Sequence, residues 1–432
     1  MQASVYSAPT SSGALDAVLS LPGSKSLTNR ELVLAAIADG PSRLRAPLHA
    51  RDTALMVEAL EVLGASIEEV DGGGAFGPDW IVTPIERRRI DAKIMTGLAG
   101  TVMRFVPPLA ALAEGTVVFD GDEHARRRPM STMTTALRDL GMSVEGDALP
   151  FTVTSTGRVR GGSLRIDASA SSQFVSGLLL AGARFEEGLR LEHTGERLPS
   201  MPHIEMTVQA LAERGVEVTS PEPGTWIVPP GPIAARDLAI EPDLSNAAPF
   251  LAAALVSGGS VTITGWPERT TQVGDELRWL LERFGGEVTT SPGAVTVRGT
   301  GRILPVDLDL SIGGELAPTL VGLAALAEGP SRITGIGHLR GHETDRLAAL
   351  AAELTALGGD VTELDEGLEI RPVPLHGGPW RSYADHRMAT TGALIGLAVP
   401  GVEIDDIATT SKTLPEFVQL WDEMLSGGAG SR

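Results

Sequence analysis

The stretch ALAEGPSRITG, residues Ala325–Gly335, is an Ala/Leu-rich run that reaches a glycine and then passes into a short alternating run. Glycine after an apolar helical run is a common helix end, and alternation after it favours a strand. The chain contains six such stretches, at a spacing of about 70 to 75 residues, which predicts one supersecondary unit stacked several times. The other five are AAIADGPSRLRAP (Ala35–Pro47), ALAEGTVVFDG (Ala111–Gly121), AGARFEEGLRLEH (Ala181–His193), ALVSGGSVTITG (Ala254–Gly265) and LAVPGVEIDD (Leu397–Asp406).

A second helix followed by two strands falls between these copies. Examples are EALEVLGASIEEV with WIVTP in the first unit, and QALAERGVEVTS with WIVPP in the third. Each unit therefore reads helix, strand, helix, strand, strand. The sixth helix of this kind, Pro415–Leu425, runs into the C-terminus without its strands. We expect the segment Ala3–Ala8 to supply the missing strand and so to join the two termini in one unit.

Two proline-containing links divide the six units. They are Leu21-Pro22 and Ile240-Glu241-Pro242, and a residue before proline favours an extended link. We predict an α/β protein of two similar lobes with three repeats each. One lobe comprises residues 22–240, the other residues 1–21 plus 241–432, with a ligand site in the cleft between them. The alternative is a doubly wound α/β fold, which has similar helices and strands.

Composition restricts the classes of function. The formal net charge of −20 argues against nucleic acid as a partner, because phosphate-backbone binding usually shows as a basic face. The chain has no cysteine, which excludes disulfides, thiolate metal sites and a cysteine nucleophile. Its histidines show no metal-ligand spacing, so we predict no metal ligand. The first twenty residues do not resemble a secretory signal, and the apolar runs are too short for a membrane span. We therefore expect a cytoplasmic protein.

Six short motifs place a cation beside Gly, Ser, Thr or another polar residue, just before a helix-like apolar run. Helix N-termini present unpaired N–H groups and the positive end of the peptide dipole, so a cation there predicts a site for phosphate or carboxylate. The motifs are PGSKSLTNR (Pro22–Arg30), AGTVMR (Ala99–Arg104), RRRP (Arg126–Pro129), HETDR (His342–Arg346), ADHR (Ala384–Arg387) and SKTLP (Ser411–Pro415).

Each motif also has a purely structural interpretation. Ser24 or Ser26 can cap the helix that begins near Lys25, and Glu343 and Arg346 are spaced as an i,i+3 ion pair. Ser171-Ser172-Gln173 is an ordinary helix start when taken by itself. PGSKSLTNR lacks the order of a Walker P-loop, so no nucleoside triphosphate is implied. Several such motifs from different repeats are harder to explain structurally than any one of them.

Together these residues resemble the 5-enolpyruvylshikimate-3-phosphate synthase family across nearly the full length. The matching motifs are PGSKSxxNR, AGTxMR, RP, SSQF, ETDR, DHRMA and SKTxP, in the family's order. The resemblance implies two lobes, each of three βαβαββ units. It also implies transfer of the enolpyruvyl group of phosphoenolpyruvate to the 5-hydroxyl of shikimate 3-phosphate. Phosphate is released, through a tetrahedral intermediate, and no cofactor is required.

The resemblance also implies roles for individual residues. Glu315 would take the proton of the attacking hydroxyl, and Glu343, with Lys25 or Lys412, would protonate the methylene carbon. The residues implied to hold shikimate 3-phosphate are Lys25, Ser26, Arg30, Ser171, Ser172, Gln173, Ser200 and His203. Those implied to hold phosphoenolpyruvate are Lys25, Gly100, Arg128, Gln173, Arg346, Arg387 and Lys412. Further residues expected to bind substrate are Thr101, Arg104, Glu315, His338 and His342.

Four positions depart from the usual pattern of that family. Glu315 stands where Asp is usual, and His203, His338 and His342 stand where Tyr, Asn and Lys are usual. Histidine keeps hydrogen-bonding capacity but lowers the fixed positive charge, so we expect substrate affinity to fall as pH rises through the histidine range. With Gly100 present, we expect the pocket to admit the phosphonate inhibitor glyphosate.

Two rival functions remain at this stage. The first is the sister enzyme that acts on UDP-N-acetylglucosamine, which typically uses a loop cysteine that this chain lacks. The second is a non-catalytic anion-binding protein of the same fold, which would have no need for both Glu315 and Glu343. We expect small-molecule substrates, no nucleic-acid or membrane partner, and a monomer.

Overall fold

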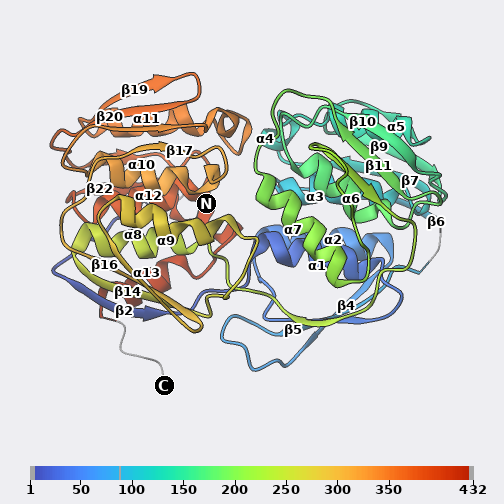
Figure 1. Ribbon diagram of the computed structural model, residues 1–432, viewed down its shortest axis with the longest axis horizontal. Helices are drawn as coiled ribbons and strands as arrows, with labels where there is room; N and C mark the ends of the chain where they lie inside the picture. The colour runs from blue at the N-terminus through green and yellow to red at the C-terminus, as the bar shows by residue number, and fades with distance from the viewer. Residues whose placement is uncertain (1–4, 87–88, 428–432) are drawn as a thin grey trace. The chain divides into compact units, whose positions relative to one another are not determined.

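The structure is a computed structural model that describes residues 5–86 and 89–427. The chain divides into two compact units (Figure 1): unit 1 contains Met1–Leu21 and Glu241–Arg432, and unit 2 contains Pro22–Ile240. The described residues form six sheets, three in each unit. Each sheet and its helices form one repeat, so the expected mixed α/β fold of two three-repeat units is confirmed.

Unit 2 holds the first three repeats. The first consists of β13 (Asp237–Ala239), α1 (Lys25–Ala36), β3 (Ser42–Arg45), α2 (Arg51–Leu63), β4 (Ser66–Val70) and β5 (Asp79–Thr83). The second consists of β6 (Arg89–Met95), α3 (Gly100–Ala110), β7 (Glu114–Asp120), α4 (Glu123–Arg126), α5 (Ser131–Asp139), β8 (Ser143–Glu145) and β9 (Phe151–Thr156). The third consists of β10 (Gly162–Ile166), α6 (Gln173–Gly182), β11 (Leu189–His193), α7 (Met201–Glu213) and β12 (Thr225–Val228).

Unit 1 holds the other three. The fourth consists of β2 (Leu15–Leu19), α8 (Ala247–Ser257), β14 (Gly259–Thr264), η1 (Val273–Glu276), α9 (Leu277–Arg283), β15 (Glu287–Ser291) and β16 (Ala294–Gly299). The fifth consists of β17 (Asp307–Asp309), η2 (Gly314–Leu316), α10 (Ala317–Ala325), β18 (Ser331–Thr334), η3 (Gly337–Gly341), α11 (Arg346–Ala356), β19 (Asp360–Leu364) and β20 (Gly367–Arg371). The sixth consists of β21 (Gly378–Trp380), α12 (His386–Gly396), β22 (Val402–Ile404), η4 (Ile407–Lys412), α13 (Phe417–Leu425) and β1 (Tyr6–Ser7).

The same pairing recurs in the sheets. A first strand runs parallel to a second, as β6 does to β7, with a buried helix as the crossover between them. An antiparallel strand then pairs with the second, as β9 does with β7. The residue pattern alone predicted five elements per repeat, and the structure has in addition the first strand that the βαβαββ unit of the resembled family implied.

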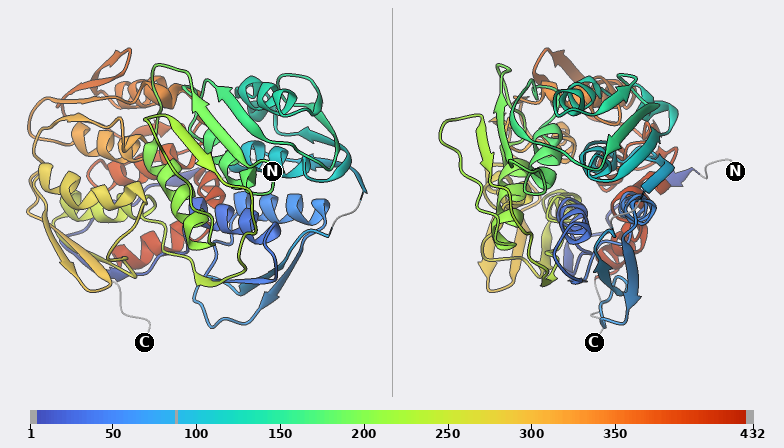
Figure 2. Two further views of the ribbon diagram at one scale, coloured as in Figure 1. Left: turned by 45° about the vertical axis from the view of Figure 1, so that its right-hand side comes forward. Right: turned by 90° about the vertical axis from the view of Figure 1, so that its right-hand side faces the viewer.

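Chain segments from far along the sequence complete two repeats of unit 1. Strand β2 pairs in parallel with β14, and β1 pairs with β22 through Tyr6–Ile404 and Ser7–Glu403. Figure 1 shows β2, in blue, beside β14 and next to α13, in red, and Figure 2 shows this from two further sides. The N-terminal segment therefore supplies the missing strand, as expected, although Ala3 and Ser4 lie outside the described residues.

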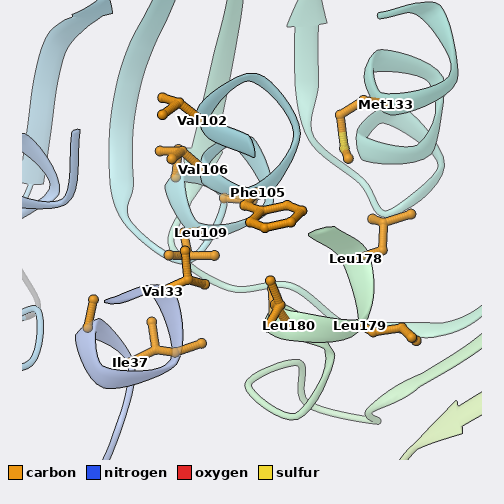
Figure 3. Packing of buried hydrophobic residues seen from close by; sticks show 14 of the residues in the cluster. Val33, Ile37, Val102, Phe105, Val106, Leu109, Met133, Leu178, Leu179 and Leu180 are labelled. Atoms are coloured by element: carbon orange, nitrogen blue, oxygen red, sulfur yellow. The ribbon is translucent and has the colours of Figure 1, made fainter. Parts of the chain in front are cut away.

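One helix of each repeat is buried on every side. In α3 every residue from Gly100 to Ala110 is buried, and in α12 every residue from His386 to Gly396. A helix that is apolar all round has to lie inside a protein. Figure 3 shows Phe105 and Leu109 of α3 among side chains of α1 and α6, including Val33 and Leu180. In each unit the three buried helices contact one another, α1, α3 and α6 in unit 2, and α8, α10 and α12 in unit 1.

Two local predictions differ from the structure. The run VEVTS in the third repeat forms only an isolated bridge between Thr219 and Ile227. Pro221 and Pro223 follow at once, and proline has no N–H to donate to a sheet. The last helix begins at Phe417 rather than at Pro415. Within the described parts of the chain, no helix has both the length and the apolar character needed to cross a bilayer.

Candidate active site

The N-termini of the buried helices carry most of the residues singled out in the sequence. In unit 2, Lys25 begins α1, Gly100 begins α3 and Gln173 begins α6. The side chain of Ser24 caps α1 by accepting from the Leu27 N–H, which settles the choice between Ser24 and Ser26. In unit 1, Arg387 lies in the first turn of α12, and Glu315 lies in η2 directly before α10.

Arg30 of α1 links two repeats of unit 2. Its guanidinium is buried and donates 2.8 Å hydrogen bonds to the Ser26 carbonyl, the Thr207 hydroxyl and the His203 carbonyl. It also lies over the ring of Phe105, 5.3 Å from the ring centroid. These contacts fix the backbone of Ser26 and His203, two of the residues implied to bind shikimate 3-phosphate. Lys25 lies at the same helix end, with its Nζ 3.9 Å from Asp52 Oδ2.

Gly100 is surrounded by polar and cationic groups. A Cβ atom at this position would lie 2.9 Å from Gln173 Oε1, 3.1 Å from Arg104 Nη1 and 3.2 Å from Arg128 Nη2. An amide and two guanidinium groups therefore converge on the backbone at Gly100, which forms the floor of the small space between them. An anion that approached this floor would meet N–H donors from α3 and both arginines.

The residues around Gly100 are fixed by bonds between helix ends. Asn29 of α1 donates to Thr101 Oγ1 at 2.7 Å, and Arg128 donates to the Leu98 carbonyl at 3.2 Å. Buried polar atoms without a partner among the described residues include Asn29 Oδ1, Gln173 Oε1 and Arg128 Nε. Buried polar groups normally make hydrogen bonds, so their concentration here is typical of a ligand site.

The remaining predicted residues of unit 2 lie at the starts of α6 and α7. Ser171 Oγ accepts from the Gln173 N–H at 3.3 Å, and Ser172 is buried. Ser200 precedes α7 with φ of 55°, a left-handed conformation that is strained for serine. Such strain is common where a side chain has to be held in one direction, and His203 lies in the next turn.

In unit 1 two of the predicted cations, Arg346 and Lys412, contact carboxylates. Arg346 makes two hydrogen bonds to Asp385, at 2.8 and 3.1 Å, and a third to Glu343 Oε2 at 3.1 Å. Lys412 Nζ contacts the other oxygen of Glu343. Burial by itself would lower the pKa of Arg346, but Asp385, Glu343 and Glu315 outweigh it and raise that pKa above its ordinary value. Glu343 is thus held between two cations.

Asp385 also fixes the start of α12. Its side chain accepts from the Arg387 N–H at 2.8 Å, and Arg387 Nη1 donates to the Ser245 carbonyl at 2.8 Å. The two residues before it, Tyr383 and Ala384, both have φ of 55°. The Tyr383 hydroxyl donates to Glu353 at 2.5 Å, and burial together with this bond raises the pKa of Tyr383 to about 12. Tyr383 therefore remains a donor throughout the neutral range.

Glu315 belongs to a second group of carboxylates. Ser245 Oγ lies 3.2 Å from Glu315 Oε1 and 3.1 Å from Asp243 Oδ1. His338 lies against Gly314, whose Cβ would be 2.5 Å from the imidazole Nε2, and its ring packs edge-on against that of His342. His342 Nδ1 lies 3.3 Å from Arg346 Nη1. In unit 1 the structure thus brings predicted site residues of the fifth and sixth repeats together.

Two of the six motifs precede a helix as predicted, RRRP before α5 and SKTLP before α13, but their cations do not lie in its first turn. Lys412 is the last residue of η4, while α13 begins only at Phe417, so Lys412 is not at a helix N-terminus. Arg128 lies between the short helix α4 and α5, in the RRRP loop. Both cations are placed by side-chain contacts, with Glu343 and with the Leu98 carbonyl, rather than by a helix dipole.

Sequence reasoning did not identify Asp385, Asp243, Ser245 or Asn29 as parts of these clusters. A signal was present for two of them, because Asp243-Leu-Ser245-Asn246 is a capping pattern directly before a long apolar run. Asp385 belongs to the motif ADHR, but its partner Arg346 is 39 positions away in the sequence, so no local pattern indicates the pair.

Comparison with known proteins identifies the family. The family model for EPSP synthase (3-phosphoshikimate 1-carboxyvinyltransferase) matches residues 9–421. The chain belongs to this family. An EPSP synthase family protein of Kocuria rhizophila, named 3-phosphoshikimate 1-carboxyvinyltransferase, is 55% identical to it, over 98% of this chain and 97% of the relative.

Solved structures show the same fold at low identity. An EPSP synthase from Acinetobacter baumannii has a TM-score of 0.78 at 24% identity, covering 97% of each chain. The enolpyruvyl transferase NikO from Streptomyces tendae has a TM-score of 0.75 at 20% identity, covering 96% of each chain. The two-unit architecture is therefore that of EPSP synthases and of a further enolpyruvyl transferase.

Proposed function

We propose that this chain transfers the enolpyruvyl group of phosphoenolpyruvate to the 5-hydroxyl of shikimate 3-phosphate and releases phosphate. The reaction belongs to the shikimate pathway of aromatic amino acid biosynthesis. The observation that carries this proposal is the family match over residues 9–421, supported by a 55% identical relative named for that activity. The clusters described above contain the chemical groups that such a reaction needs.

Residues of unit 2 serve binding in this proposal. Hydroxyl and amide groups suit a sugar-like polyol, and arginine suits phosphate because its planar fork can form two hydrogen bonds. The residues assigned to shikimate 3-phosphate are Lys25, Ser26, Arg30, Ser171, Ser172, Gln173, Ser200 and His203. Those assigned to phosphoenolpyruvate are Lys25, Gly100, Thr101, Arg104, Arg128 and Gln173 from this unit, with Arg346, Arg387 and Lys412 from unit 1.

Residues of unit 1 serve proton transfer. The carboxylate of Glu315 takes the proton of the 5-hydroxyl as its oxygen attacks the second carbon of phosphoenolpyruvate. That carbon gains cationic character when the methylene carbon is protonated, and the acid is Glu343 acting with Lys412, its direct contact, or with Lys25. Loss of the methyl proton and of phosphate then completes the elimination. No step transfers electrons to a redox partner.

One assay tests this proposal. Phosphate release is measured with phosphoenolpyruvate plus shikimate 3-phosphate, and in parallel with phosphoenolpyruvate plus UDP-N-acetylglucosamine. Release with the first pair alone is the expected result. Release with the second pair, or with neither, contradicts the proposal. We propose further that the enzyme acts as a cytoplasmic monomer, which sedimentation at working concentration tests.

A further inference from the structure

The hydroxyl of Ser245 lies between two carboxyl groups. Its Oγ is 3.1 Å from Asp243 Oδ1 and 3.2 Å from Glu315 Oε1, and both Ser245 and Asp243 are buried. Asp243 Oδ1 also accepts from the backbone N–H of Asn246 at 3.0 Å. Ser245 is itself held in place, because its carbonyl accepts from Arg387 Nη1.

The number of protons decides what these contacts mean. Two oxygen–oxygen contacts require two protons to be hydrogen bonds, but a serine hydroxyl supplies one. When both Asp243 and Glu315 are ionised, one contact brings two lone pairs together without a proton. When Glu315 carries a proton, Glu315 donates to Ser245 and Ser245 donates to Asp243, and both contacts are hydrogen bonds.

The surroundings decide which carboxyl takes the extra proton. Asp243 Oδ1 already accepts from the Asn246 N–H, and it lies 3.1 Å from Ser245 Oγ against 3.2 Å for Glu315 Oε1, so the Ser245 proton is placed towards Asp243. Its lone pairs then point towards Glu315. The charged and titratable groups near Glu315 include Arg346 of α11, whose pKa the charge of Glu315 raises, and His338 of η3, which lies against the neighbouring Gly314, while Arg387 of α12 holds Ser245.

We propose that Ser245, oriented by Asp243, is a positioning residue that strengthens Glu315 as a base, because its hydrogen bond to Glu315 forms only when Glu315 receives the substrate proton. This rests on the proposed function. The O–H bond of the substrate hydroxyl breaks, its oxygen forms the new C–O bond, and the proton binds Glu315 Oε1 and is donated to Ser245 Oγ. The hydrogen bond between Ser245 and Glu315 therefore strengthens as the reaction proceeds. An interaction that is stronger in the transition state than in the ground state raises kcat.

The experiment compares Ser245→Ala with the matched control Ser260→Ala. Ser260 also donates to a carboxylate, Asp16, but on the exposed surface of β14. We expect Ser245→Ala to lower kcat about tenfold with little change in KM, and to move the acid limb of the kcat/KM profile about one pH unit lower. The limb moves down because a weaker base stays ionised to lower pH. Ser260→Ala leaves both unchanged, and Ser245→Thr, which keeps the hydroxyl, restores the wild-type limb.

A second measurement does not depend on activity. The ¹³C resonance of the Glu315 carboxyl, assigned by its loss in Glu315→Gln, is titrated in wild type, Ser245→Ala and Ser260→Ala. A lower midpoint only in Ser245→Ala supports the proposal. An unmoved acid limb and an unmoved midpoint overturn it, even when kcat falls, because the role is then only structural.

Failure of the proposed function gives a different result. Wild-type enzyme that releases no phosphate from phosphoenolpyruvate and shikimate 3-phosphate contradicts that function, while the ¹³C midpoint still decides the role of Ser245. If Ser245→Ala does not fold, Ser245→Cys replaces it. Cysteine keeps the volume and has only weak hydrogen-bonding capacity, so the same shift is expected.

Discussion

In unit 2 the guanidinium of Arg30 holds carbonyl and hydroxyl oxygens, whereas in unit 1 the guanidinium of Arg346 holds the carboxylates of Asp385 and Glu343. A cation bonded to neutral oxygens keeps its charge available to an anionic ligand. A cation bonded to a carboxylate instead controls where that carboxylate keeps its proton. For these two arginines the difference therefore lies in the hydrogen-bond partners of the cation rather than in the fold, whereas Lys25 of unit 2 approaches Asp52 and Arg387 of unit 1 donates to the Ser245 carbonyl.

The largest expected effect is in unit 1, at Glu343. Glu343→Gln removes an acid held between Lys412 and Arg346, and we expect kcat to fall about a thousandfold with a smaller change in KM. Steady-state phosphate release measures this. The control is Glu328→Gln, an exposed carboxylate paired with Arg302. If Glu343→Gln kept the wild-type kcat, Glu343 would not be the acid, and proton transfer would not distinguish unit 1 from unit 2.

The next effect is in unit 2, at Arg128. Among the described residues no carboxylate pairs with Arg128, which donates to the Leu98 carbonyl. Arg128→Gln therefore loses a charged donor for phosphoenolpyruvate. One such bond is worth about 1.5–3 kcal/mol, so we expect KM for phosphoenolpyruvate to rise roughly 10- to 100-fold. Its neighbour Arg127, exposed and paired with Glu123, provides the control Arg127→Gln. A drop in kcat at unchanged KM would show that unit 2 does more than bind.

A smaller effect is expected at the floor of the same space. The methyl group of Gly100→Ala would approach Gln173, Arg104 and Arg128 to about 3 Å, which displaces them by a few tenths of an ångström. We expect about a tenfold rise in KM for phosphoenolpyruvate. Glyphosate should inhibit the wild type and should inhibit Gly100→Ala much less, as measured by its inhibition constant. Gly231→Ala is the control, since nothing lies within 4 Å of its Cβ. If glyphosate inhibited Gly100→Ala as strongly as Gly231→Ala, its binding site would lie away from Gly100.

The smallest effect concerns a carboxylate of unit 2 that serves stability. Arg126 and Lys93 hold the pKa of Asp120 well below its usual range. A depressed carboxyl pKa stabilises the fold above the unfolded value of about 4, and this stabilisation is lost as pH falls towards the folded value. Asp120→Asn should thus lower stability at pH 7 by about 2 kcal/mol, and the difference from wild type should shrink below about pH 4.

Urea unfolding at both pH values measures this difference, with Asp122→Asn on the exposed Arg51 pair as the control. Turnover should stay at the wild-type level in both variants. Loss of turnover in Asp120→Asn would mean that unit 2 also uses carboxylates in the reaction.

The repeats and the helix starts could be predicted from the local sequence. The runs that end in glycine predicted helices such as α10 and strands such as β18, because apolar periodicity and a glycine stop act within one segment. Ser24 as the cap of α1 and the ion pair of Glu343 with Arg346 followed from spacings of three residues. A helix cap and an i,i+3 ion pair depend only on residues that are close in the sequence, so the sequence alone is enough to predict them.

The contacts between repeats were not predictable in the same way. Ser245 and Glu315 are 70 positions apart, and Lys412 and Glu343 are 69 apart, so no local pattern joins them. Their pairing depends on how three buried helices pack. The motif SKTLP precedes α13 as predicted, but Lys412 itself lies at the end of a 3₁₀ turn, where its contact with Glu343 holds it.

The placement of β1 and β2 in unit 1 has a consequence for how the protein is made. The ribosome produces these two strands before unit 2, yet their partners β14 and β22 emerge only after the whole of unit 2. Unit 2 already has all its strands once Ala239 of β13 has left the exit tunnel, and it can fold during translation. Strands β1 and β2 thus reach their native neighbours late, because unit 2 is synthesised between them and their partner strands.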